Sequence, residues 1–406
     1  MTKYKLGELV EVTRGASLSG QFYAEEGKLI RLTLGNFNMN GGGFKENTSK
    51  TDLYYTGIVK DEFILNEGDI ITPLTEQSLG LLGTTARIPD SGKYIQSQDV
   101  ALVKCKEGLL DPNFCYYLIS SSIVRQQLSA GAQQTKIRHT SPDKIKDSTV
   151  WVPELEVQKS IGRILSDIDE KIALNRQTND NLEAMAKQLY DYWFVQFDFP
   201  NEEGKPYKSS GGAMVWNEKL KREIPQEWSD CILGEICDMY QPKTLGLNDL
   251  SEDSEYKVYG ANGIIGHYSS YNHENSEIAM ACRGNSCGTI NRTSPKSWIT
   301  GNAMVIKFRN KEIHNEYIKQ ALKYANVKGA ISGSGQPQLT RENLSLLKMT
   351  QPNYAILEAF SQKVAAIVAM ELEIEEQNDN LTKQRDELLP LLMNGQASVN
   401  YHLSDD

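Results

Sequence analysis

The sequence predicts an α+β chain built twice, in which each half carries a mixed-sheet block followed by one long helix, with a pseudo-twofold relation between the halves. The motif Asn179-Asp180-Asn181-Leu182 returns unchanged 199 residues later as Asn378-Asp379-Asn380-Leu381. Each copy lies in a long stretch whose apolar residues are spaced three and four apart, which is typical of an amphipathic helix. A repeat of about half the chain indicates a duplicated unit and not a solenoid.

The first long helix is predicted over residues 153–199. Pro200 ends it, because proline disfavours the helical conformation of the residue before it. At about 1.5 Å per residue the helix would be roughly 60 Å long. Its apolar positions follow a heptad-like seam, and they are Ile161, Leu165, Ile168, Ile172, Leu182, Ala186, Leu189 and Trp193.

The second long helix is predicted over residues 352–395, weakening at Pro390. Asn179 and Asn378 occupy equivalent positions, whereas Asn175 is equivalent to Ile374. Two interpretations of the asparagines stay open: a solvated stretch of helix, or a buried polar pair that fixes the register. Either way, a stripe this apolar packs on the other helix or on a partner. The seam positions of this copy are Phe360, Val364, Ile367, Ile374, Leu381, Leu388 and Leu392.

The blocks that precede the helices, residues 1–152 and 229–351, repeat more faintly. Asp99-Val100-Ala101-Leu102-Val103 corresponds to Asn302-Ala303-Met304-Val305-Ile306, and Asn113-Phe114 to Glu316-Tyr317. Apolar runs punctuated by Gly, Asn and Ser predict a mixed sheet with loops in each block. One short helix is expected around 113–128 and another around 315–325. Residues 200–228 are predicted to form an exposed connector, and residues 396–406 a tail.

The net charge of −10 is unevenly distributed. Residues 153–203 and 352–406 carry −6 and −7, so the rest of the chain sums to +3. A local basic patch on the blocks could therefore bind DNA, because screening acts over about 8–10 Å. Six cysteines lack Cys-x-x-Cys spacing, and there is neither an apolar leader nor a run of eighteen apolar residues. We expect reduced thiols, no membrane span and a cytoplasmic location.

No catalytic motif is recognisable in the sequence. The phosphate-binding loop, the zinc-binding His-Glu-x-x-His helix and the nucleophile elbow are absent. The Asn-Pro-Pro motif of an amino-methyltransferase is absent as well, and the five histidines complete no metal-ligand set with the cysteines. His139, His267 and His273 are expected to be loop or hydrogen-bonded residues. The sequence therefore predicts a binding protein without catalytic residues, metal or cofactor of its own.

Several segments resemble the specificity subunit of type I restriction–modification systems. The first is the helix end Tyr192-Trp193-Phe194-Val195-Gln196-Phe197-Asp198, which runs into the connector Gly204-Lys205-Pro206-Tyr207 and then Ile224-Pro225-Gln226-Glu227-Trp228. The others, residues 259–266, 283–288 and 298–303, resemble segments of a target recognition domain. The resemblance covers nearly the whole chain in order, although the first block matches less closely.

The resemblance implies that each block is a target recognition domain reading one half of a bipartite site in double-stranded DNA. The two long helices would form an antiparallel coiled coil that separates these domains and docks two methyltransferase (M) subunits. Those subunits would bind S-adenosylmethionine and methylate adenine N6. Restriction (R) motor–nuclease subunits using ATP and Mg could join them. The alternative is a protein–protein scaffold with a dimerising coiled coil; a fused modification enzyme would need a cofactor fold.

Base readout requires forked donors and acceptors, and phosphate contacts require basic or hydroxyl side chains. We selected loop residues of these types as candidate DNA contacts. In the first block they are Arg14, Asn36, Asn38, Thr75, Gln77, Arg87, Gln98, Gln134, Lys136 and Arg138. In the second they are Lys243, Asn262, His267, Tyr268, Arg283, Asn285, Ser286, Asn291, Arg292, Gln336, Gln338 and Arg341.

Overall fold

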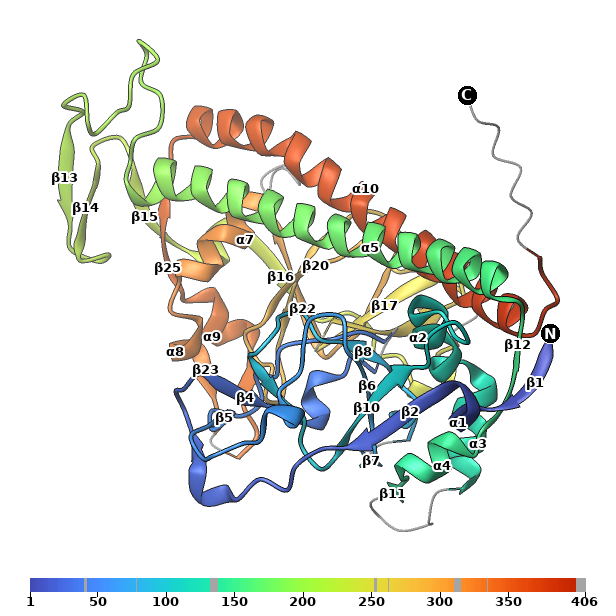
Figure 1. The fold of residues 1–406 in the computed structure, drawn as a ribbon. Helices are drawn as coiled ribbons and strands as arrows, with labels where there is room; N and C mark the ends of the chain where they lie inside the picture. Colours follow the sequence, from blue (N-terminus) through green and yellow to red (C-terminus); the bar gives the residue numbers. More distant parts are fainter. Residues whose placement is uncertain are drawn as a thin grey trace. The chain divides into compact units, whose positions relative to one another are not determined.

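The computed structural model describes residues 1–39, 42–77, 79–131, 138–251, 254–261, 263–309, 315–333 and 335–398. The chain divides into two compact units, unit 1 (Met1–Asn175 with Gln377–Asp406) and unit 2 (Arg176–Glu376). Each unit contains one mixed-sheet block and one half of each long helix (Figure 1). The predicted domains followed chain order, whereas the compact units divide both long helices. The mixture of helices and sheets confirms the predicted α+β class.

Unit 1 begins with the first block. Its elements are β1 (Thr2–Lys5), α1 (Leu6–Leu9), β2 (Val10–Arg14), η1 (Gly20–Phe22), β3 (Tyr23–Ala24), β4 (Leu29–Arg31), η2 (Leu34–Asn36), β5 (Tyr54–Tyr55), η3 (Asp61–Phe63), β6 (Ile70–Pro73), β7 (Thr75–Glu76), β8 (Ala86–Arg87), β9 (Tyr94–Ile95), β10 (Val100–Cys105), α2 (Pro112–Ser120), α3 (Ser122–Gly131), β11 (Arg138–His139), α4 (Pro142–Lys146) and β12 (Thr149–Val152).

Unit 2 contains the connector and the second block. Its elements are β13 (Met214–Asn217), β14 (Arg222–Pro225), β15 (Ser229–Ile232), α6 (Leu233–Ile236), β16 (Cys237–Tyr240), η5 (Leu247–Asp249), β17 (Tyr256–Gly260), β18 (Gly263–Tyr268), β19 (Ile278–Ala281), β20 (Ile290–Arg292), β21 (Trp298–Ile299), β22 (Ala303–Phe308), α7 (Asn315–Tyr324), α8 (Val327–Ala330), β23 (Ile331–Ser332), β24 (Gln338–Leu339), α9 (Arg341–Ser345) and β25 (Lys348–Gln351).

The two blocks share the strand order of their main sheet and differ in the second one, which is β3-β5-β4-β9 in unit 1 and β18-β17-β21 in unit 2. The four-stranded sheet β2-β10-β6-β8 of unit 1 has its counterpart in β16-β22-β19-β20 of unit 2, and the pair β1–β12 in β15–β25. Each block also has one parallel pair, β4 with β9 and β17 with β21. The segments matched by sequence, residues 99–103 and 302–306, lie in the central strands β10 and β22. The duplication predicted from the repeated motif therefore extends to strand order.

The central strands are buried on both faces, which explains their nearly continuous apolar sequence. Successive side chains of a strand point to opposite faces. Ala101 and Val103 of β10 accordingly pack with Phe114 of α2, while Val100 and Leu102 pack in a second cluster. In unit 2, β22 divides its side chains in the same way between a large cluster that includes α7 and a smaller one beside β17.

The long helices α5 (Leu155–Tyr190) and α10 (Tyr354–Met393) pack against each other in antiparallel directions within each unit (Figure 1). In unit 1, Ile161 and Leu165 share a buried cluster with Leu392. In unit 2, the ring of Phe360 lies 4.9 Å from Phe194. Helix α5 continues into a π-helical turn over Asp191–Val195, and α10 passes through Pro390 before it ends.

The seam asparagines find partners that the repeat did not indicate. Asn175 Nδ2 donates to Asn378 Oδ1 at 3.0 Å in unit 1, and Asn175 is buried. In unit 2, Asn179 Nδ2 donates to the backbone oxygen of Glu371 at 3.3 Å. In an antiparallel pair the direction and register of the helices, and not the repeat, decide which residues face each other, and here Asn378 pairs with Asn175 and not with its equivalent, Asn179. A buried pair of Asn179 with Asn378 is therefore not formed; the polar pair across the helices joins the buried Asn175 to the half-buried Asn378.

The connector is more ordered than an exposed linker. The ring of Phe199 stacks on Tyr207 at 4.7 Å and on Trp228 at 5.0 Å. The carboxylate of Asp198 accepts hydrogen bonds from the backbone and the hydroxyl of Ser209 at 2.7 and 2.6 Å. Strands β13 and β14 then form an antiparallel hairpin. These contacts tie the end of α5 to the second block within unit 2.

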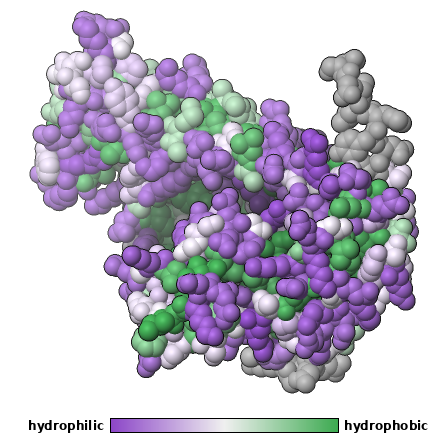
Figure 2. All heavy atoms as spheres, viewed as in Figure 1, coloured by the Kyte–Doolittle hydropathy of each residue, from purple (hydrophilic) through white to green (hydrophobic). Residues whose placement is uncertain are grey.

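On the face shown in Figure 2, hydrophilic residues predominate and hydrophobic ones are scattered between them. Within the described part of the chain, no helix is long and apolar enough to cross a membrane.

Phe360→Ala should destabilise unit 2 by about 3–5 kcal/mol, because it removes a fully buried ring that also contacts Trp193 and leaves a cavity. Denaturant unfolding followed by tryptophan fluorescence measures the change. Met370→Ala, on an exposed position of the same helix, is the control and should change the free energy of unfolding by less than about 0.5 kcal/mol. Equal effects of the two substitutions would contradict the packing described here.

Candidate nucleic-acid interface

In unit 1, several candidate residues meet at one end of the four-stranded sheet. Arg14, the last residue of β2, pairs with Ala101, while Pro73 at the end of β6 pairs with Val100. The loops after β2 and β6 and the loop before β10 therefore emerge at the same end. The pairing of β7 with β11 adds Arg138 there. We call this surface the sheet end of unit 1; its candidate residues are Arg14, Thr75, Gln77, Gln98 and Arg138.

The loop that carries Gln77 is held by a buried carboxylate. Glu76 is 2% exposed, and its Oε2 accepts hydrogen bonds from the backbone N–H groups of Gly80, Leu81 and Leu82 at 3.1, 2.9 and 3.1 Å. Its Oε1 pairs with Arg138 Nη1 at 3.1 Å. One side of the Arg138 guanidinium is thus occupied by an ion pair within the unit and is not available to DNA. The sequence analysis did not select Glu76. The sequence feature that could have indicated its role is the position of this carboxylate just before a turn that contains Gly80.

Unit 2 has an equivalent sheet end. Ala281 at the end of β19 pairs with Ala303, the first residue of β22. Two residues further on, Arg283 forms a bridge with Gln338, as Thr75 pairs with His139 in unit 1. Arg283 therefore occupies the position that Thr75 has in unit 1. The candidate residues at this sheet end are Lys243, Arg283, Asn285, Ser286, Gln336, Gln338 and Arg341.

The backbone around Arg283 is fixed while its side chain is exposed. Gly284 donates its N–H to the oxygen of Pro337 at 3.0 Å and has a φ of +76°, which glycine adopts without strain. Gln241 Nε2 donates to the oxygen of Gly301 at 3.1 Å on the neighbouring loop. The guanidinium of Arg283 forms no hydrogen bond or ion pair with a described residue. A rigid backbone with a free forked donor suits recognition of a guanine edge or a phosphate.

Arg87 and Arg292 lie in strands and not in loops, which differs from the expectation. They end the equivalent strands β8 and β20. Arg87 Nη2 donates to Asn113 Oδ1 at 2.6 Å. Arg292, with its side chain 8% exposed, pairs with Glu316, the residue equivalent to Asn113, and lies 3.9 Å from Glu371. Both guanidinium groups thus join an edge strand to a helix, and this placement argues against direct DNA contact.

A carboxylate of α5 holds each block on the helix pair. In unit 1, Asp169 accepts from the hydroxyl of Tyr117 at 2.7 Å and pairs with Arg385 at 2.8 Å. In unit 2, Glu183 pairs with Lys319 and Lys323 of α7 and accepts from Gln320 at 3.0 Å. Burial raises the pKa of Glu183, but the hydrogen bonds and the Lys319 charge outweigh it and lower the pKa to about 2.

The other candidates are distributed as follows. Asn36 is buried, with its amide Nδ2 donating to the oxygen of Lys45 at 3.2 Å, and Asn38 is half-buried. Thr75 is buried, and His267, Tyr268 and Asn291 are half-buried in strands β18 and β20. His273 stacks on Tyr240 with ring centroids 6.0 Å apart, and burial lowers the pKa of its imidazole. Gln134, Lys136 and Asn262 lie outside the described residues.

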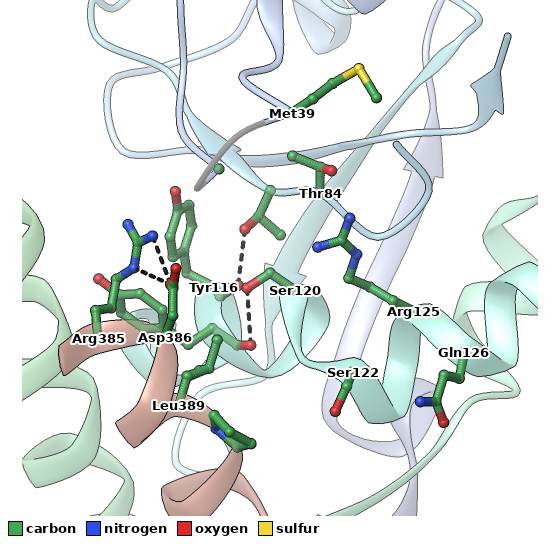
Figure 3. Close-up of a pocket in the computed structure, with 14 residues that line it drawn as sticks. Met39, Thr84, Tyr116, Ser120, Ser122, Arg125, Gln126, Arg385, Asp386 and Leu389 are labelled. Carbon is green, nitrogen blue, oxygen red and sulfur yellow. Dashed lines mark hydrogen bonds and ion pairs between the residues drawn. The ribbon is translucent and has the colours of Figure 1, made fainter. Parts of the chain in front are cut away.

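Two cavities in the described part of unit 1 are lined by polar residues. The first, of about 520 Å³, lies between α2, α3 and the final turns of α10. As Figure 3 shows, polar groups that line it are bonded to one another: Arg385 donates to Asp386 at 2.9 and 2.8 Å, and Thr85 donates to the oxygen of Tyr116 at 3.0 Å. The second cavity, of about 310 Å³, opens at the sheet end beside Gln77 and Gln98.

Glu183→Gln should lower the stability of unit 2 by about 1–2 kcal/mol at pH 7. The folded-state pKa of about 2 lies below the ordinary 4.5, so the ionised carboxylate stabilises the fold above about pH 4.5, and this contribution disappears as the pH falls toward 2. The magnitude is discounted because a third of the side chain is exposed. Denaturant unfolding at pH 7 and pH 3, with the exposed Glu376→Gln as control, measures it; a difference independent of pH would contradict the ion-pair assignment.

Comparison with known proteins identifies the family. The family described as "Type I restriction modification DNA specificity domain" matches residues 1–184 and 225–380, more than half of the chain, and the chain belongs to it. The chain spans only 28% of the length of the MjaIX relative described below, so the family match assigns a DNA specificity domain. The resemblance noted from the connector and the repeated blocks is thereby confirmed.

Individual relatives agree with the family. The type I restriction enzyme MjaIX specificity subunit of Methanocaldococcus jannaschii is 28% identical over 132 residues, which are 32% of this chain and 28% of that protein. The putative MjaX specificity subunit of the same organism is 21% identical over 385 residues, covering 86% and 85%. The crystal structure of the type I S subunit from M. genitalium has a TM-score of 0.58 at 20% identity, covering 97% and 96%, and shows the same fold.

Proposed function

We propose that this chain is the sequence-recognition subunit of a type I restriction–modification complex and reads a bipartite target, one half-site per unit. The observation that carries the proposal is the pair of equivalent sheet ends. Each gathers Arg, Asn or Gln side chains from several loops onto a rigid strand framework, and these are the side chains that read base edges. Because the two sheet ends carry different residues on the same framework, the two half-sites differ in sequence.

The charge distribution supports DNA binding by the blocks. The two helical regions carry net charges of −6 and −7, and the rest of the chain sums to +3. Repulsion between DNA and the acidic helices would be screened beyond about 8–10 Å, so contacts at the sheet ends remain favourable.

The long helices are the proposed docking surface for two methyltransferase subunits. Leu174, Met185 and Met370 are about half exposed on helices whose other faces are buried, and exposed apolar side chains of this kind mark protein contacts. The methyltransferase subunits would supply S-adenosylmethionine chemistry at adenine N6, and restriction subunits would add ATP- and Mg-dependent cleavage. This chain would determine the DNA sequence that the complex recognises and would provide the surface on which the other subunits assemble.

Methylome sequencing tests the proposal. The chain is expressed with its methyltransferase subunit in a host that lacks both, and the host alone is the control. A new bipartite motif carrying N6-methyladenine in both strands is expected. If the complex assembles and no new motif is found, the proposal fails and a protein–protein scaffold becomes the better interpretation.

Arg283→Ala should relax or abolish recognition of the half-site read by unit 2 while sparing the other half-site. Loss of one bidentate contact corresponds to about 1–3 kcal/mol of discrimination. The altered motif would be read from the methylome of the variant complex. Arg176→Ala, which removes an exposed arginine from α5 in the same unit, should leave both half-sites unchanged. An unaltered motif in the Arg283 variant would contradict this assignment.

Leu174→Glu and Met185→Glu should weaken methyltransferase binding by about tenfold or more, because a charge on the docking surface must be desolvated. Quantitative co-purification or calorimetry with the methyltransferase subunit measures the loss. Leu109→Glu places the same charge at an equally exposed leucine before α2 and should bind normally. Equal binding by all three variants would remove the helices from the interface.

A further inference from the structure

The second cavity of unit 1 has a charged floor that is locked in place. Arg31 is 6% exposed and faces the cavity from the end of β4. Its Nη2 pairs with Asp52 Oδ1 at 3.1 Å, and its guanidinium carbon lies 3.8 Å from the centre of the Tyr23 ring. Both contacts fix the guanidinium beside the cavity, where its charge is paired with the Asp52 carboxylate.

One wall of the cavity is a closed network of short polar side chains. Asn47 Nδ2 donates to Thr33 Oγ1 at 2.8 Å, and Thr33 Oγ1 donates to Asn36 Oδ1 at 3.1 Å. Ser49 Oγ donates to Asn47 Oδ1 at 2.6 Å. Asn36, selected from the sequence as a DNA contact, is thus buried behind the wall and positions it. Because these groups satisfy each other, the wall is rigid.

Two glutamines stand at the mouth of the cavity with fixed backbones and free amides. Arg14 Nε donates to the backbone oxygen of Gln98 at 3.0 Å, and the Glu76 carboxylate anchors the loop that follows Gln77. Both glutamines are exposed and line the cavity. Neither side-chain amide makes a hydrogen bond with a residue that the structure describes, so both are available to a ligand.

We propose that Gln77 and Gln98 determine the specificity of unit 1 and read adenine in the major groove. A glutamine amide offers one acceptor and one donor, which match the N6 amino group and N7 of adenine. The cavity lining is not uniformly positive, because Arg31 is ion-paired with Asp52 and Asp99 also lines the cavity, so the selection of adenine rests on the two amides. The cavity can also hold several waters of about 30 Å³ each, which bridge bases to the polar wall. This inference rests on the proposed function.

The test compares methylomes of complexes carrying wild-type chain, Gln77→Ala, Gln98→Ala and the double variant. Each single substitution should reduce discrimination at one adenine-containing position of one half-site by roughly 5- to 150-fold, the equivalent of one bidentate contact. Both effects should fall in the same half-site. Gln336→Ala, at the sheet end of unit 2, should affect only the other half-site, and Gln226→Ala, an exposed glutamine of the hairpin, should affect neither.

Gln98→Glu gives a second, size-conserving readout. A carboxylate only accepts hydrogen bonds, so preference at the affected position should move from adenine toward cytosine, whose N4 amino group donates. The inference is overturned if the Gln98→Glu variant keeps its preference for adenine. It is also overturned if the double alanine variant is active and its half-site is unchanged. Neither result contradicts the proposed function. A uniform loss of methylation at all sites with a smaller salt dependence overturns it in favour of phosphate contacts. Absence of any motif with wild-type chain overturns both proposals.

Discussion

The attachment of each mixed-sheet block to the pair of long helices is the constraint on which the rest of each unit depends. In both units the helix after the central strand lies on α5 and α10, through an apolar cluster and one carboxylate of α5. That contact buries one face of the four-stranded sheet. The second face packs in a separate apolar cluster with residues of the sheet that contains the parallel pair. The end of the sheet, where several loops emerge together, is what remains for recognition, because loops supported by a rigid scaffold can vary without loss of the core.

The sequence predicted the duplication, both long helices and the equivalence of β10 with β22, since each of these is visible as local periodicity or as repeated letters. It did not predict which asparagine faces which. Partner choice in an antiparallel pair depends on direction and register, and the repeat alone shows only equivalence. It also missed the hairpin in the connector, because the stack of Phe199 with Tyr207 and Trp228 forms between residues far apart in that segment.

For the recognition surface, residue type identified Arg14, Gln77, Gln98 and Arg283 as candidates, and strand register brings them to the sheet ends. The same criterion selected Arg87 and Arg292, whose guanidinium groups are bonded inside their units. Residue type cannot separate the two cases, since burial of a charged group is decided by partners distant in sequence. For that reason the buried groups that organise the surface, Glu76 and Arg31, were also missed.

Comparison of equivalent positions shows how one framework carries two different loop surfaces. Where Arg87 meets Asn113 in unit 1, Arg292 meets Glu316 in unit 2. Tyr117 and Gln320 are also equivalent, and each bonds a carboxylate of α5, although Asp169 and Glu183 are different positions of that helix. These replacements come in matched sets, because a buried polar group that loses its partner is costly. At the sheet ends the replacement of Thr75 and His139 by Arg283 and Gln338 needs no such match, since both side chains of unit 2 are exposed there. Residues at the sheet ends can therefore change one at a time, whereas the buried residues beneath them change together with their partners. A duplicated recognition protein requires both, because its specificity can then change while each block stays attached to the helices.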